Sequence, residues 1–410
     1  MSLPVFDRFL ATPEIGAVFS DAAVMQGLFR FEAALARAEA AEGLIPAAAA
    51  SSIASMCRAE LFDLEAIAAA SGRAGSLAIP LVDELRRTVG LVDPEAARWV
   101  HFGSTSQDAI DTGMALVTRD ALALVDRTLG RVCDALFTLA EAHADTPVLA
   151  RTLMQPAQVT SFGLKCANWL APLLRSRARL REQGARSLAL QLGGAVGTLS
   201  VIGERAPQVA QRMAAELGLA APDAPWHTQR DEWVRLGLEA AVLTGSLGKL
   251  ATDLALMSQG EIAELAEPTA AGRGGSTAMP HKRNPVAAMA ALAAAQRTPQ
   301  RAAALLAAMA QQHERGLGNW QAELAEWPGL WISTHGAASA MAEAMQGLQV
   351  DAARMRRNIG VLEGPVYADA DAVAQAARQA AAQARARLAS LRALALPPVC
   401  WPEPDAESTS

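Results

Sequence analysis

The sequence has 410 residues and a formal net charge of −6, and 51% of its residues are hydrophobic but only 4% are aromatic. This length is enough for one large core or two to three smaller ones, and the acidic balance argues against a nucleic-acid-binding surface. Alanine dominates the apolar residues, and small side chains let helices approach closely in long bundles. We therefore predict an all-α fold.

The cysteines and the first residues bear on the compartment. No two cysteines are spaced as in a metal-binding or redox motif, so we expect buried, reduced thiols in a cytoplasmic protein. The N-terminus lacks the basic and apolar blocks of a signal peptide, and charged residues interrupt every Ala-rich run before it could span a membrane. The six histidines are scattered, so we expect neither a metal nor a cofactor. The four cysteines are Cys57, Cys133, Cys166 and Cys400.

Two helix starts are signalled in the first third of the chain. Ser20 and Asp21 offer N-caps for a helix that runs to about residue 42. A much longer helix follows position 105, because apolar residues recur in steps of three and four from Ile110 to Leu139. It would be on the order of 50 Å long, which suits a multi-subunit bundle. We predict further helices at about 161–184, 229–265, 286–312, 329–350 and 369–394, before a disordered tail at 397–410.

A polar block begins the long helix, at residues 101–112. Thr105 or Ser106 is placed to cap the helix, and ordinary capping is sufficient to explain these hydroxyl groups. The same groups, together with His101, also suit a carboxylate-binding site, because the N-terminus of a helix attracts anions. The residues alone leave both interpretations open.

A second polar stretch, residues 272–285, lies between two predicted helices. Its three glycines allow unusual backbone angles in the first half, and two prolines restrain the second half. Between them the stretch concentrates a hydroxyl pair, an amine, a guanidinium and an amide. Most loops of this composition are solvated linkers, but the concentration of polar groups in an Ala-rich chain also makes the stretch a candidate active-site loop. The groups in question belong to Ser276, Thr277, Lys282, Arg283 and Asn284.

This stretch resembles the Gly-Ser-Ser-x-Met-Pro-x-Lys-x-Asn loop of the fumarase/aspartase superfamily, with Thr277 in place of the second serine. Other blocks at 101–112 and 151–163 resemble the first and second active-site blocks of that superfamily. The strings at 29–46, 226–231 and 313–323 are similar to its cycloisomerase branch, the bacterial enzymes that lactonise 3-carboxy-cis,cis-muconate. The resemblance extends from about residue 5 to about residue 360.

The resemblance implies three helical domains, of which the central one is a long-helix bundle that tetramerises. We place an N-terminal helical domain at 1–105, the bundle at 106–352, and a shortened C-terminal helical segment with a flexible tail at 353–410. In such a homotetramer each site is shared between subunits. The implied partner is a small polycarboxylate, with no nucleic acid and no membrane.

The resemblance also assigns roles to residues. It implies a cofactor-independent lactonisation in protocatechuate (β-ketoadipate) breakdown. Ser276 would transfer the proton, and Lys282 and Asn284 would stabilise the charge that develops. Arg315 is either a carboxylate clamp or one half of a surface ion pair with Glu314 or Glu323, and we hold these equal. The remaining expected substrate-binding residues are His101, Thr105, Ser106, Thr152, Gln155, His227 and Arg230.

Two positions depart from the lyases of the superfamily. Leu153 stands where fumarase and adenylosuccinate lyase carry a catalytic histidine, and Met289 stands where they carry its partner carboxylate. Losing both members suggests that this acid–base pair is not used. The alternatives are a C–N lyase acting on adenylosuccinate or on a smaller amino or nitro adduct, a catalytically silent helical scaffold, and a cycloisomerase for a related diacid. Pro156 stands where the cycloisomerase branch is expected to carry a polar residue, and it leaves the exact diacid open.

Overall fold

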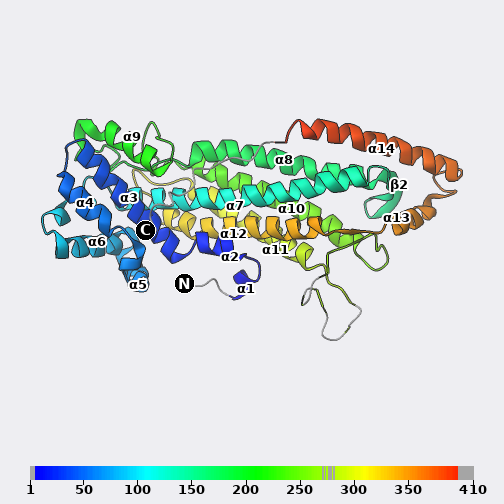
Figure 1. Cartoon of the computed structure of the whole chain (residues 1–410), viewed down its shortest axis with the longest axis horizontal. Coiled ribbons are helices and arrows are strands. Elements are labelled where there is room, and N and C mark those ends of the chain that lie inside the picture. The colour runs from blue at the N-terminus through cyan, green and yellow to red at the C-terminus, as the bar shows by residue number, and fades with distance from the viewer. Residues whose placement is uncertain (1–4, 270–271, 273, 276–278, 280–281, 396–410) are drawn as a thin grey trace.

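The computed structural model describes residues 5–269, 272, 274–275, 279 and 282–395, and the prediction of an all-α fold is confirmed. Figure 1 shows an elongated molecule with a small helical domain at one end and a bundle of long helices along the rest. The helices of the small domain are α3 (Asp21–Ala41), α4 (Ala47–Met56), α5 (Leu64–Ala74) and α6 (Ala78–Val92). The first two helices, α1 (Val5–Arg8) and α2 (Pro13–Val18), lie against the bundle instead, where α2 contacts α7 and α12.

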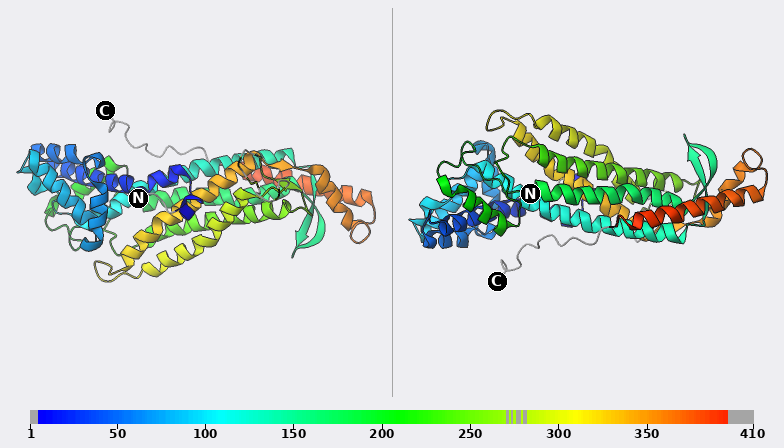
Figure 2. Two further views of the ribbon diagram at one scale, coloured as in Figure 1. Left: turned by 90° about the horizontal axis from the view of Figure 1, so that it is seen from below. Right: turned by 90° about the horizontal axis from the view of Figure 1, so that it is seen from above.

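Five long helices form the bundle, and Ala-rich faces let them pack closely against one another. The longest, α7, has 37 residues, and its buried side includes the predicted stripe from Ile110 to Leu136. At about 1.5 Å per residue it is roughly 55 Å long. Figure 2 shows the five helices running side by side. They are α7 (Ser106–Ala142), α8 (Phe162–Ser187), α10 (Asp231–Met257), α11 (Val286–Ala308) and α12 (Asn319–Gln346).

Most helix starts agree with the caps in the sequence, but α12 begins earlier than predicted. Ser20 caps α3 by accepting a hydrogen bond from the Ala23 amide. The prediction started α12 at about residue 329, just after Pro328, a residue type that usually interrupts a helix. The structure instead keeps Pro328 inside a helix that begins at Asn319. Packing of Trp327 and Trp331 in the core favours helix on both sides of the proline.

The small domain is joined to the bundle by a close crossing of α3 and α7. A β-carbon added at Gly27 of α3 would lie 3.0 Å from the carbonyl oxygen of Gly113 on α7. The two glycines therefore let the helix backbones approach without side chains between them. Helix α9 (Ala206–Leu217) also packs against α3, although it follows α8 in the chain. The end of the molecule that holds the small domain thus includes a segment from within residues 106–352.

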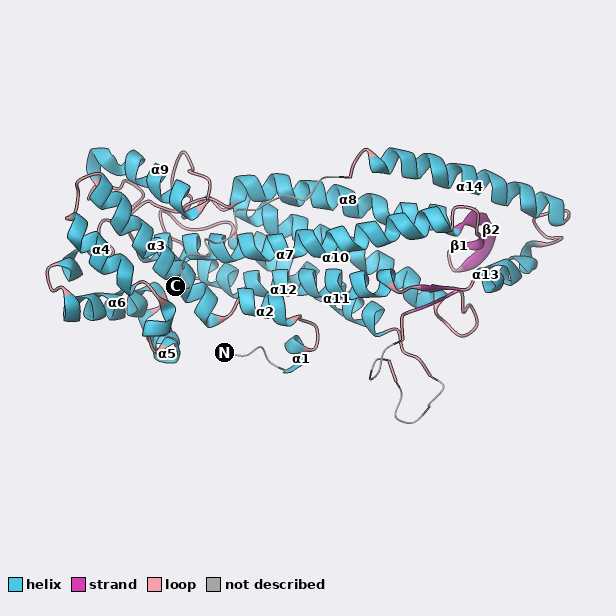
Figure 3. Cartoon of the chain, viewed as in Figure 1, coloured by secondary structure: helices cyan, strands magenta, loops and turns pink. Residues whose placement is uncertain are grey.

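The bundle ends in a β-hairpin that the sequence analysis did not anticipate. Strands β1 (Pro147–Thr152) and β2 (Gln155–Ser161) pair antiparallel directly after α7. The hairpin projects from the far end of the bundle (Figures 2 and 3). A second pairing joins the two-residue strands β3 (Leu265–Ala266) and β4 (Gln349–Val350).

The C-terminal segment covers the same end of the bundle. Helix α13 (Ala352–Asn358) packs against β1, and α14 (Ala370–Arg392) runs back along α8. A small second core lies beneath them, formed by Leu149, Val159, Ile359 and Leu362. The Tyr367 hydroxyl fastens it to the hairpin by accepting a 3.0 Å hydrogen bond from the Val159 amide.

Within the described ranges, α10 is the one helix that is long and apolar enough to cross a membrane, and half of its most apolar window is buried. Its buried side packs against α8, α11 and α12, as a core helix of a bundle does. Cys57, Cys133 and Cys166 are buried free thiols, and Cys400 lies outside the described residues.

Candidate active site

The start of α7 is organised around the buried carboxylate of Asp108. Its oxygens accept hydrogen bonds from the backbone amides of Thr105, Gly193 and Gly194, at 2.9–3.0 Å. Thr105 is the N-cap residue of α7, and its backbone amide donates to the Asp108 side chain, so capping, the ordinary interpretation of this block, is correct at this position. Ser106, the first residue of the helix, and Thr105 are half-buried. The bonds to Asp108 draw the Gly-rich run at 191–199 against the polar block at 101–112.

His101 lies at the edge of this group, in a left-handed backbone conformation with φ of 64°. Its Nδ1 is 2.6 Å from the Oε1 of Glu32, a carboxylate that is fully buried on α3. Burial by itself lowers the pKa of His101, but the Glu32 carboxylate outweighs it and holds the pKa above the usual value. The charged imidazolium is therefore favoured at a position where an anion could approach the start of α7.

His227 and Arg230 join the same end of the bundle, but they are buried. The Nε2 of His227 lies 2.6 Å from Asp108 Oδ1. The guanidinium of Arg230 donates to Asp111 at 2.8 and 3.2 Å, pairs with Glu323, and stacks 4.4 Å from the centre of the Trp226 ring.

The side chain of Arg230 is 0% exposed. We expected it to hold a substrate carboxylate, whereas its donors are already directed at two carboxylates of the same chain. This geometry is that of a buried ion-pair network rather than an open clamp. His227 differs from the expectation in the same way, because it is buried against Asp108.

Arg315 reaches this group from the segment between α11 and α12. Its Nη2 donates to the carbonyl oxygens of Gly194 and Ala195, at 2.6 and 3.1 Å, and its Nη1 donates to the Glu314 carbonyl. No carboxylate of the described residues lies within ion-pair distance, so the surface ion pair with Glu314 or Glu323 is absent from this part of the chain. The half-buried guanidinium keeps its charge beside the start of α7.

Thr152 and Gln155 lie in the other group, at the tip of the β1–β2 hairpin, where they face each other in register. The two residues between them, Leu153 and Met154, have positive φ angles of 50° and 65° and are 97% and 67% exposed. Leu153 therefore fills no core in this chain. The histidine expected at this position in the lyases has been replaced by an apolar group that extends outward.

Lys282 and Asn284 are on the segment that leads into α11. They line a cavity of about 310 Å³ with Glu267 and Gly274. The backbone N–H of Asn284 donates to the Gly274 carbonyl at 2.9 Å. Met289, on the first turns of α11, is 45% exposed. Ser276, the expected proton-transfer residue, lies outside the described residues.

The expected residues thus form two groups that α7 separates. The group of His101, Thr105, Ser106 and Arg315 is at its first turn, whereas Thr152 and Gln155 follow its last turn by about ten residues. The two groups are therefore about 50 Å apart. Figures 1 and 2 show the hairpin at the end of the bundle that is far from the small domain. One chain alone does not bring the two groups together.

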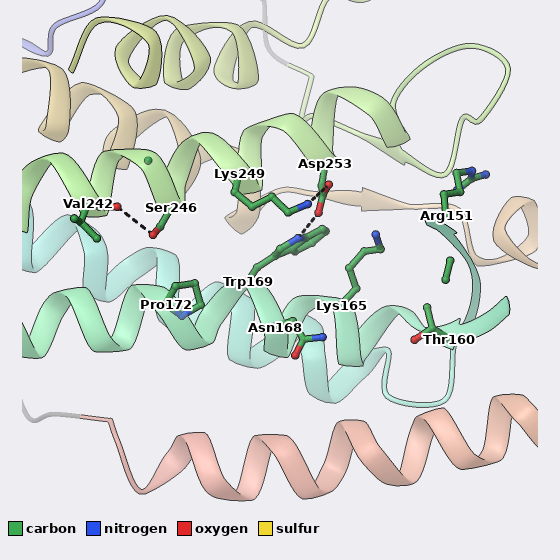
Figure 4. A pocket seen from close by; sticks show the side chains of 12 residues that line it. Arg151, Thr160, Lys165, Asn168, Trp169, Pro172, Val242, Ser246, Lys249 and Asp253 are labelled. Atoms are coloured by element: carbon green, nitrogen blue, oxygen red, sulfur yellow. Dashed lines mark hydrogen bonds and ion pairs between the residues drawn. The ribbon is translucent and has the colours of Figure 1, made fainter. Parts of the chain in front are cut away.

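A larger pocket of about 620 Å³ lies between α8, α10 and the hairpin (Figure 4). It contains none of the expected site residues, although Arg151 and Thr160 of the hairpin line it. Lys249 pairs with Asp253, and Arg151 pairs with Glu264 at 3.2 Å. Lys165 has no carboxylate within ion-pair distance among the described residues, and burial lowers its pKa. The sequence analysis missed this lysine, because only the fold brings its helix against α10.

The described residues contain no group of three or more His, Cys, Asp or Glu side chains placed to hold a metal ion. The chemistry available at the expected positions is that of cations, hydroxyls and amides. Such groups bind carboxylates and stabilise negative charge.

The Lyase family model matches residues 8–299, and the chain belongs to this family. The resemblance to the fumarase/aspartase superfamily is confirmed.

Within this family, the chain is similar to several individual proteins. The 3-carboxy-cis,cis-muconate cycloisomerase of Pseudomonas aeruginosa is 49% identical over 374 residues, which cover 91% of this chain and 82% of that protein. The crystal structure of the 3-carboxy-cis,cis-muconate lactonizing enzyme from Pseudomonas putida is 43% identical, with a TM-score of 0.85 over 95% of this chain and 87% of that one. Nitrosuccinate lyase of Streptomyces davaonensis is 40% identical over 363 residues, covering 87% of this chain and 76% of that protein.

Proposed function

We propose that this chain is a 3-carboxy-cis,cis-muconate cycloisomerase that forms 4-carboxymuconolactone without a cofactor, in protocatechuate breakdown. The observation that carries the proposal is the 49% identity to an enzyme of that name over 91% of the chain. The apolar, exposed Leu153 and Met289 support it further. An acid–base pair of the lyase type is absent from these positions. An intramolecular addition needs less catalysis from the enzyme than a bimolecular one, because its nucleophile is already tethered to the reacting carbon.

The proposed reaction moves one proton and makes one C–O bond. A carboxylate oxygen of the substrate adds to a carbon of the C=C bond, and the electron pair passes to the adjacent carbon and its carboxylate. Lys282 and Asn284 stabilise the extra negative charge as donors held in place before the reaction. Ser276 delivers the proton to the carbon, which completes the lactone. Thr105, Ser106, Thr152, Gln155 and Arg315 hold the remaining carboxylates.

The site would be assembled in a homotetramer in the cytoplasm. The separation of the two groups by about 50 Å supports an oligomer, because no motion within one chain joins the ends of a helix. Exposed apolar side chains on the hairpin, α10 and α11 also support an oligomer, since exposed apolar surfaces are commonly buried against a partner protein. They are Leu153, Met154, Val242, Met289 and Leu306. Light scattering should give the mass of four chains, and a stable monomer would contradict the shared site. Buried free thiols support the compartment.

The experiment that tests the reaction is an ultraviolet assay of the purified protein without added cofactor. We expect 3-carboxy-cis,cis-muconate to lose its diene absorbance. Nitrosuccinate is assayed in parallel, because the 40% identity to a nitrosuccinate lyase favours a C–N lyase as the second candidate. Turnover of nitrosuccinate alone would replace the cycloisomerase with that lyase. Inactivity on both would contradict both proposals.

A further inference from the structure

Glu267 makes an unusual pair of hydrogen bonds across the loop that carries Lys282 and Asn284. Its Oε2 accepts from the Ala287 amide at 3.0 Å, and its Oε1 accepts from the Ala288 amide at 2.8 Å. Both amides belong to the first turn of α11, where backbone N–H groups have no partner inside the helix. A carboxylate there also interacts favourably with the helix dipole.

The local sequence cannot supply this cap. Pro285 occupies the N-cap position of α11 and makes no side-chain capping bond. A capping residue next to the helix would satisfy the amides without restraining any other segment. Glu267 instead follows strand β3, 20 residues before Ala287, so the same two bonds hold the two ends of the loop together.

A second hydrogen bond joins the two sides of the same loop. The backbone N–H of Asn284 donates to the carbonyl of Gly274 at 2.9 Å. Gly274 has a φ of +67°, and a β-carbon there would lie 2.6 Å from the Asn284 carbonyl oxygen, so this approach requires glycine. Glu267, Gly274, Lys282 and Asn284 all line the cavity of about 310 Å³.

We propose that Glu267 is a positioning residue for the reaction. Its carboxylate holds the residue that precedes the loop against the N-terminus of α11. This contact thereby determines the positions of Lys282 and Asn284. The inference rests on the proposed function, in which these two residues stabilise the charge that develops. Glu267 accepts hydrogen bonds from backbone amides, and its proposed role is to place Lys282 and Asn284.

The test compares Glu267→Ala and Glu267→Gln with the wild-type enzyme in steady-state kinetics on 3-carboxy-cis,cis-muconate. A misplacement of about 1 Å can cost roughly 100-fold, so we expect Glu267→Ala to lower kcat by about that factor. KM should stay within about threefold, because the other carboxylate-binding groups are untouched. Glu267→Gln keeps one acceptor oxygen, so its kcat should fall between those of the wild type and the alanine variant.

Asp63→Ala is the matched control. Asp63 caps α5 by accepting from the Ala66 amide at 3.0 Å, but it is the residue next to its helix and lies in the small domain. The control should lose stability and keep the wild-type kcat. Amide hydrogen exchange checks the geometry: Ala287 and Ala288 should exchange faster in Glu267→Ala, while the rest of α11 stays protected.

Three outcomes would overturn the inference. A Glu267→Ala enzyme with wild-type kcat and a lowered melting temperature would show that the cap only stabilises the fold. Unchanged exchange at Ala287 and Ala288 would show that the two bonds do not form. If the wild-type enzyme is inactive on this substrate, the proposed function fails, and the positioning role that rests on it fails too.

Discussion

At the first turn of α7, charged groups are buried and paired within one chain, whereas beyond its last turn polar and apolar groups face outward. Arg230 is enclosed by Asp111, Glu323 and Trp226. The tip of the hairpin leaves Leu153 97% exposed, and Lys282 lines an open cavity. The difference suggests that the first end is preorganised by the monomer, while the second end needs a partner to complete it.

The largest expected effect is on turnover. We expect Ser276→Ala to lower kcat by about 10³-fold or more, because it removes the hydroxyl that is proposed to deliver the proton to the reacting carbon. The free energy of unfolding should remain that of the wild type. The measurement is kcat alongside a thermal melt. Near-wild-type turnover would remove Ser276 from the mechanism.

At the first end the expected effect is on stability. Arg230→Met would leave Asp111 and Glu323 buried without their cation, which should cost about 3–5 kcal/mol in the free energy of unfolding. Urea denaturation at fixed protein concentration measures it. The control is Arg235→Met on the same helix, because Arg235 is exposed and lies 4.0 Å from its carboxylate partner, Glu232. The control should change stability by less than about 0.5 kcal/mol. Equal losses in the two variants would contradict a built-in network at this end.

A further effect on stability should appear as a pH dependence. Burial, together with the nearby Glu32, raises the pKa of Glu39 to about 9, and neither carboxyl oxygen has a hydrogen-bond partner in the described part of the chain. The folded protein keeps this proton up to about pH 9, whereas the unfolded chain releases it near pH 4.5. Stability contributed by Glu39 is therefore complete below pH 4.5 and lost as the pH rises towards 9.

Glu39→Gln should remove this dependence, since an amide does not titrate. At pH 8 the variant should be more stable than the wild type, and the two should converge towards pH 5. Urea denaturation across this range is the measurement. Parallel curves for the two proteins would show that Glu39 ionises in the folded state as it does in the unfolded one.

The sequence predicted the features that depend on neighbouring residues. Ser20 and Thr105 begin their helices where capping chemistry places them, and the step of the apolar residues gives the length of α7. The hairpin was missed because Pro156 and the polar residues around it do not alternate as in a half-buried strand. Its strand pairing is stabilised instead by contacts with α13 and α14, far along the chain.

The roles of the charged site residues depended on partners that are distant in sequence. Arg230 was expected to be open to substrate, yet Asp111 is 119 residues away from it in the sequence and Glu323 is 93 away. No local pattern reveals such a pair. In contrast, the motif around Lys282 and Asn284 was recognisable as a string, because a loop that contacts substrate carries its chemistry in consecutive residues. The separation of the two groups follows from the length of α7, which the sequence predicted and the structure confirms.

The most direct test of sites shared between subunits is complementation of two inactive chains. One chain carries Ser276→Ala, and the other carries Ser106→Ala with Arg315→Met, so the two chains carry lesions at different expected site positions. Co-expressed with two different tags, they should form hybrids that regain activity, with about a quarter of the sites free of both lesions if subunits mix at random. Purified hybrids that contain both chains and remain inactive would contradict a site built from more than one subunit.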